Sequence, residues 1–183
     1  MKALSVRQPW AWALVTKIEG SPVGDKIVEN RTWPHSYRGP LLIVSSRKPA
    51  MDASYVLAVL EQNTGHRPAY DEKYLALGSV LGVVDMVACL TLETYLQCRT
   101  FAESECVDLM RIIKGVDQGK LILPDDTEQG VDWWACGPWC HIYTNVRRLP
   151  PTRSSGRLGL YELGSVNGVP VQEWIKQEGM FVR

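Results

Sequence analysis

Three charged side chains fall close together in the segment Lys26-Ile27-Val28-Glu29-Asn30-Arg31. A lysine beside a glutamate can provide an oxyanion stabiliser and a general base, so Lys26 and Glu29 are the candidate catalytic residues. On an ideal strand, Glu29 and Arg31 share one face, whereas Lys26 points to the other. A bulge or the strand end is therefore needed to bring all three together. From the residues alone, they form either a ligand-facing site or an ordinary Glu29–Arg31 ion pair.

A second set of residues has the chemistry to bind a nucleotide or single-stranded RNA. An Arg guanidinium suits phosphate, a Gln amide can read the edge of a base, and a tryptophan face can stack on one. The turn at 45–48 adds hydroxyls, cations and backbone N–H groups. The candidates are Arg7, Gln8, Trp12, Arg31, Trp33, Arg38, Ser45, Ser46 and Lys48. The alternatives are structural: Gln8 as a helix cap, Arg38 in an exposed turn, and Trp10 in the core.

The sequence offers little support for a metal or a cofactor. Cys136, Cys140 and His141 have a C-x-x-x-C-H spacing without an obvious second pair, whereas tetrahedral zinc requires four ligands. The sequence contains no P-loop, dinucleotide fingerprint or Ser/His/Asp order. We therefore expect no metal and no cofactor.

Length and composition predict one domain over residues 1–183. The chain is 45% hydrophobic, which is enough to build a core without disulfides, and its five cysteines are an odd number. Its apolar runs are far shorter than the ~20 residues that cross a bilayer, and it opens without a basic-then-apolar leader. We expect a cytoplasmic protein with no membrane contact and infer no obligate protein partner.

Charge is unevenly distributed along the chain, although the formal net charge is zero. Residues 1–50 carry eight Lys/Arg and three Asp/Glu, residues 51–132 six and fourteen, and residues 133–183 six and three. If the fold brings the two basic segments together, they form one face that attracts phosphate. A merely solubilising role for these charges is the alternative.

Hydrophobic patterns predict an α+β protein built on a small mixed β-barrel of five to six strands, closed or nearly closed, with helices inserted around it. The expected strands are 2–7, 26–33, 40–46, 78–90, 139–146 and 158–163, with a bulge at Gly82. The expected helices are 9–19, 49–65, 102–114 and 171–178. Prolines and cations at 147–156 predict a turn.

Three segments together carry a family resemblance: Ser5-Val6-Arg7-Gln8-Pro9-Trp10-Ala11, Gly24 to Trp33 with its G-x-K-x-x-E-x-R core, and Tyr37 to Ile43. In this order and spacing they resemble the ASCH domain, a branch of the PUA-like β-barrel superfamily. The resemblance covers most of the chain and leaves residues 95–132 as an insertion. It implies a polar cleft lined by the first helix and the Lys-Glu-Arg strand, which binds RNA or a modified nucleotide. In that context, we favour the ligand-facing arrangement of Lys26, Glu29 and Arg31.

The resemblance also suggests a hydrolase as an alternative. The motif is similar to that of PUA-like enzymes that remove the acetyl group from acetylcytidine with a Lys, a Thr and a later Glu. Lys26 matches the lysine, but Glu29 occupies the threonine position, so the hydroxyl is missing. An amidohydrolase acting on an acylated nucleoside, or a ribonuclease, would use Glu29 as base and Lys26 as oxyanion stabiliser. Glu103 or Glu105 would supply the second carboxylate.

Overall fold

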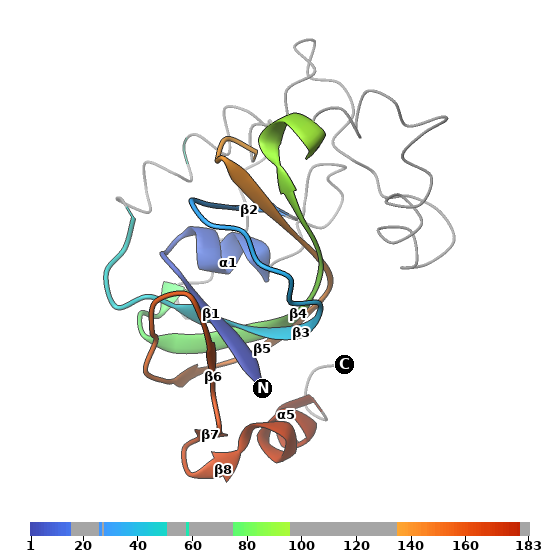
Figure 1. Cartoon of the computed structure of the whole chain (residues 1–183). Helices are drawn as coiled ribbons and strands as arrows, with labels where there is room; N and C mark the ends of the chain where they lie inside the picture. Colours follow the sequence, from blue (N-terminus) through green and yellow to red (C-terminus); the bar gives the residue numbers. More distant parts are fainter. Residues whose placement is uncertain (16–25, 27, 51–57, 59–74, 96–134, 180–183) are drawn as a thin grey trace, which may run out of the picture.

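The fold is a six-stranded mixed sheet with helices on both faces (Figure 1). The computed structural model describes residues 1–15, 26, 28–50, 58, 75–95 and 135–179. The strand order is β2-β5-β4-β3-β1-β6, with β1 and β3 parallel and all other neighbours antiparallel. The strands are β1 (Lys2–Val6), β2 (Val28–Arg31), β3 (Gly39–Ser45), β4 (Ser79–Thr91), β5 (Trp139–Arg153) and β6 (Leu160–Glu162).

This architecture confirms the predicted α+β class and mixed sheet. Within the described residues the ladder is open, because the outer strands β2 and β6 do not pair with each other. The helix expected at 102–114, with Glu103 and Glu105, lies outside the described residues. So do nearly all of the helix expected at 49–65 and of the insertion expected at 95–132.

The apolar run of β3 is buried on both faces, as predicted, because each face packs against a helix. Leu41 and Ile43 pack on the side of α1 (Trp10–Leu14), whereas Leu42 and Val44 pack on the side of α5 (Val171–Gly179). The hairpin of β7 (Ser165–Val166) and β8 (Val169–Pro170) precedes α5. Among the described helices, none is long and apolar enough to span a bilayer.

Helix α1 is shorter than predicted and buries a different tryptophan. It ends at Leu14, where the Val15 N–H bonds to the Trp12 carbonyl, rather than near Glu19. Trp12 is only 2% exposed, whereas Trp10 is half-buried. The predicted stripe through Trp10 fails because α1 is a single turn that is buried from Ala11 to Leu14.

Strand β5 continues to Arg153 through the segment for which the sequence predicts a turn. Two prolines, Pro150 and Pro151, lie within it. Among the described residues, β5 past Ile142 pairs only with β4, because β2 covers Trp139 to Ile142. A proline removes one ladder donor, which is tolerated where the strand has an open edge.

Gly82 allows the end of α1 to approach the sheet beside a register shift in β4, where a bulge was expected. A Cβ atom at this position would lie 2.6 Å from the Arg147 carbonyl oxygen and 2.8 Å from Val15 Cγ1. Both contacts are shorter than van der Waals distance, and one of them is to backbone. A side chain at residue 82 would therefore push α1 and β5 away from β4.

The variant Gly82→Ala is expected to lower the free energy of unfolding by about 1 to 3 kcal/mol through overpacking. Gly164→Ala is the matched control, because no atom lies within 4 Å of the added Cβ. Urea unfolding of the two variants measures the difference. Equal stability of both variants would show that the α1–β4 contact yields easily.

Candidate functional site

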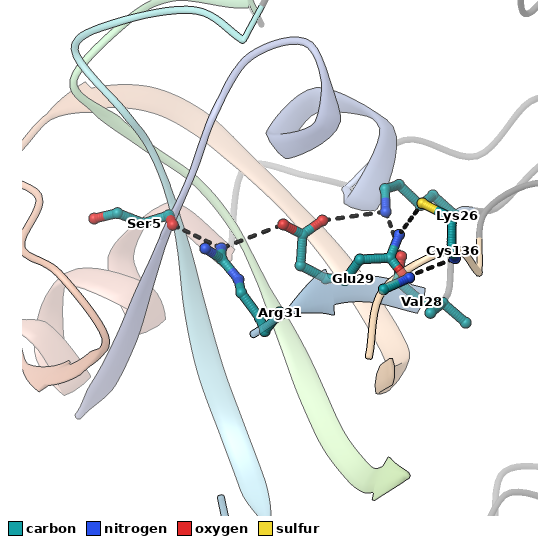
Figure 2. A network of polar contacts seen from close by, with 8 residues as sticks. Ser5, Lys26, Val28, Glu29, Arg31 and Cys136 are labelled. Carbon is teal, nitrogen blue, oxygen red and sulfur yellow. Dashed lines mark hydrogen bonds and ion pairs between the residues drawn. The ribbon is translucent and has the colours of Figure 1, made fainter. Parts of the chain in front are cut away.

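The three charges of the 26–31 segment converge at the start of β2 (Figure 2). The Glu29 carboxylate lies between two cations, with Oε2 3.1 Å from Lys26 Nζ and Oε1 3.3 Å from Arg31 Nη2. Lys26 Nζ also donates to the Val28 carbonyl. Lys26 lies before the first residue of the strand, which frees it from strand alternation. The prediction that a strand end is needed for this convergence is confirmed.

This cluster is closed rather than open to solvent. Lys26 is 3% exposed and Glu29 is 8% exposed. The half-buried Trp10 ring adds a cation–π contact, with its centroid 5.8 Å from Lys26 Nζ. A buried carboxylate is costly unless it is ion-paired, which accounts for the two cations. The expected wet cleft is therefore replaced by an internal ion-pair network, and the Glu29–Arg31 ion pair is the alternative that the structure contains.

Arg31 also joins two distant strands of the sheet. Its Nη2 donates to the Ser5 carbonyl at 2.8 Å, although β2 and β1 are not neighbours in the strand order. The Val6 carbonyl accepts the Ser46 N–H on the β3 side of β1. Carbonyls of consecutive strand residues point to opposite sides, so the Ser5 carbonyl points to the β6 side. The pairing with β6 ends at Leu4, one residue before Ser5. The guanidinium supplies the donor that β6 no longer provides.

Three predicted binding residues have structural roles. Gln8 is buried; its Oε1 accepts the Trp12 N–H at 3.1 Å and its Nε2 donates to the Ala76 carbonyl at 3.2 Å. Ser45 is buried and bonds the Ala76 carbonyl at 2.7 Å while accepting the Ser79 N–H. Trp12 is too deeply buried to stack on a ligand at the surface. Gln8 is therefore a helix cap, the structural alternative.

The remaining predicted residues lie nearer the surface. Arg7, Arg38 and Lys48 are exposed, and Ser46 and Trp33 are half-buried. Arg38 Nη1 donates to the Tyr37 carbonyl at 2.8 Å, within an exposed turn. The structure thus separates the predicted set into a buried network, buried supporting residues, exposed cations and the half-buried Ser46 and Trp33.

One end of the sheet gathers five exposed cations, which we call the cationic end. Parallel strands β1 and β3 both finish there, as does β5 opposite the start of β4. The segment after β5 crosses this end, with the Ser154 N–H bonded to the Gly78 carbonyl and the Arg157 N–H to Ser5 Oγ. The cationic end consists of Arg7, Arg47, Lys48, Arg153 and Arg157. Because β1 also pairs with β6, the two basic segments lie side by side as predicted.

Comparison with known proteins identifies the family. The sequence model of the ASCH domain matches residues 4–136, most of the chain. The chain belongs to the ASCH domain family. Two solved structures similar to this ASCH domain are both single-residue mutants of ZmASCH from Zymomonas mobilis. Each is 12% identical with a TM-score of 0.44, covers 96% of this chain, and is itself covered over 94% and 96% of its length, respectively. No curated protein matches this chain.

This ASCH domain also has a polar cluster that the sequence did not reveal as one. His141 lies directly across from Glu29 on β2, and its Nε2 is 3.0 Å from the Trp33 carbonyl. The His35 ring packs edge-on against His141, with centroids 4.4 Å apart. Burial is the main cause that lowers the pKa of each histidine to about 4. Strand alternation at 139–146 placed His141 and Tyr143 on one face, but nothing in the sequence put His35 beside them.

The residues considered as metal ligands are separated by the strand. His141 lies on the same face as Tyr143, whereas Cys140 packs with Ile142 on the opposite face. Cys136 Sγ accepts a hydrogen bond from Asn30 Nδ2, and Asn30 Oδ1 accepts the N–H groups of Cys136 and Gly137. Among the described residues, no group of three such side chains is placed to hold a metal.

Proposed function

We propose that this ASCH domain binds single-stranded RNA or a modified nucleotide and holds the phosphates at the cationic end. The observation that supports this is the gathering of five exposed cations from three separate segments of the chain. The described stretches that build this end, 1–15, 39–50, 75–84 and 147–161, contain no Asp or Glu. A surface that carries only positive charge attracts phosphate, and the planar guanidinium of Arg matches the geometry of a phosphate group.

The overall charge limits the kind of nucleic acid. With a net charge of zero, the domain has no excess charge to neutralise a long duplex. A short single strand requires only a few phosphate contacts together with contacts to unstacked bases. The proposal is therefore a short single strand or one nucleotide, as the family resemblance implies.

The double variant Arg153→Ala/Arg157→Ala is expected to weaken binding of a short single-stranded RNA about tenfold at low salt. The slope of log affinity against log salt should fall by about 0.7 for each lost phosphate contact. Lys176→Ala on α5 is the matched control, because it removes an exposed cation away from the cationic end. Fluorescence anisotropy over a salt series measures both quantities. Equal affinities and slopes for the two variants would refute the proposed surface.

The geometry does not favour a hydrolase. Each carboxylate oxygen of Glu29 is ion-paired with a cation, and the side chain is buried, an arrangement that supports a structural role more than a general base. Lys26 is committed to Glu29 and to the Val28 carbonyl. In this proposal, Lys26, Glu29 and Arg31 hold the start of β2 in place and do not react. The cytoplasmic location and the lack of a cofactor stay predictions.

A further inference from the structure

Several buried polar atoms on the α1 side of the sheet have no hydrogen-bond partner within the described part of the chain. Buried polar groups are satisfied in the great majority of cases, so a group of exceptions in one place requires an explanation. Leaving each one unsatisfied is unfavourable, because the group has lost its water without gaining a partner. These atoms are Arg31 Nε, Tyr143 Oη, His141 Nδ1 and both ring nitrogens of His35, together with Trp12 Nε1 on α1 itself.

Arg31, His141 and Tyr143 share one face of the sheet, and His35 contacts His141 from the loop after β2. His141 is the cross-strand neighbour of Glu29 on β2 and of Cys89 on β4. Tyr143 follows two residues later on β5 and Arg31 two residues later on β2, so both share that face. We call Arg31, His35, His141 and Tyr143 the His–Tyr cluster.

One hydrogen bond fixes which nitrogen of His141 is a donor and which is an acceptor. The Trp33 carbonyl can only accept, so His141 Nε2 carries the proton and Nδ1 is a bare acceptor. Burial, together with the positive charges of Arg31 and Arg38, lowers the pKa of His141 to about 4, despite the opposing effect of the Trp33 bond. At neutral pH, Nδ1 therefore presents a lone pair to any guest. Such a bare acceptor would bind an N–H or O–H donor.

The cluster reaches the surface through the loop that follows β2. Residues 32–38 alternate between exposed and half-buried positions, and Trp33 and His35 are half-buried. The Trp33 ring lies 5.6 Å from that of His35 and 5.0 Å from that of His141, so the approach is lined with aromatic rings. A planar guest is suited to such surroundings.

From these contacts we infer that the His–Tyr cluster binds the edge of an uncharged heterocycle bearing an N–H donor, such as the exocyclic amine of a nucleobase. The inference rests on the proposed function and separates two contacts: phosphate binds at the cationic end, and the base edge binds His141 Nδ1 and Tyr143 Oη. Ser5 lies between the two, since its carbonyl binds Arg31 and its hydroxyl binds the Arg157 N–H.

The test compares cytidine with N4,N4-dimethylcytidine, which keeps the ring and ribose but lacks the exocyclic N–H. Cytidine is expected to bind at least about tenfold more tightly, and to shift the ring ¹⁵N resonance of His141 Nδ1. Tyr143→Phe should reduce the affinity for cytidine about tenfold. Because that change removes a buried hydroxyl with no described partner, it should leave the free energy of unfolding unchanged or raise it.

Tyr161→Phe is the control for loss of a tyrosine hydroxyl: Tyr161 packs on the opposite face of the sheet and its hydroxyl contacts Ser5 Oγ, not the His–Tyr cluster, so cytidine binding should be unchanged. Equal affinity for the two cytidines, or for parent and Tyr143→Phe, would show that the cluster holds only buried water and would overturn the inference. An abasic oligonucleotide separates the two claims. If it binds with an affinity that depends on Arg153 and Arg157 while the cytidine tests fail, the cationic end stands and the base site falls.

Discussion

Glu29→Ala is expected to lower the free energy of unfolding by about 3 to 5 kcal/mol. The substitution leaves Lys26 and Arg31 near each other with their shared counter-charge removed. Lys26 is 3% exposed, so solvent cannot replace the lost carboxylate without local opening. Urea unfolding followed by circular dichroism measures the change.

The chain contains a matched control for this prediction. Glu162 also lies between two cations, 3.2 Å from the Met1 amino group and 3.1 Å from Lys2 Nζ, but its side chain is 64% exposed. Glu162→Ala should leave stability nearly unchanged, because surface ion pairs contribute little. Adding Lys26→Met to Glu29→Ala should recover part of the loss. If Glu29→Ala and Glu162→Ala are equally stable, the buried network does not stabilise the fold.

Acidification is expected to destabilise the protein between about pH 6.5 and pH 4. His35 and His141 have folded-state pKa values of about 4, below the ordinary 6.5, so between these pH values the unfolded chain binds more protons than the folded chain. Their contribution is fully present above pH 6.5 and is lost as pH falls toward 4. The loss should reach about 2 to 4 kcal/mol, below the simple sum because His35 is partly solvated.

Urea unfolding at a series of pH values tests this assignment. His35→Phe should flatten the pH dependence by about half while preserving an aromatic ring against His141. The third histidine, His66, remains in every variant. Free energies of unfolding that are constant from about pH 7 to about pH 4.5, or a His35→Phe variant with the parental slope, would contradict the placement of these histidines in a buried, cation-flanked cluster.

Local patterns predicted the sheet well. The apolar run before Ser46 is buried on both faces as β3, and the Gly82 irregularity lies in β4 where it was expected. Both features depend on residues that are adjacent in the sequence. The predicted convergence of Lys26 with Glu29 at a strand end also follows from local geometry.

Features set by distant contacts were not predicted. Whether a charge faces solvent depends on what covers it, and the neighbours of the Lys26–Glu29 pair include Trp10 of α1, over Lys26, and His141 of β5, opposite Glu29. Pro150 by itself indicates a turn, but it lies within β5. It is tolerated there because, among the described residues, the pairing of β5 with β2 ends at Ile142, which leaves that edge of β5 without a ladder that needs an N–H at this position. The pairing of His35 with His141 joins residues far apart in the chain, beyond the reach of any spacing rule.

The bond from Arg31 to the Ser5 carbonyl has a consequence for motion. Every junction between neighbouring strands in this sheet is a backbone ladder, which opens only when several peptide hydrogen bonds break together. Within the described residues, β2 and β1 are linked by the Arg31 guanidinium and not by a backbone ladder, so local opening on this side of β2 breaks fewer hydrogen bonds. Amide hydrogen exchange should therefore be faster along β2 than along the paired centre of β3 and β4.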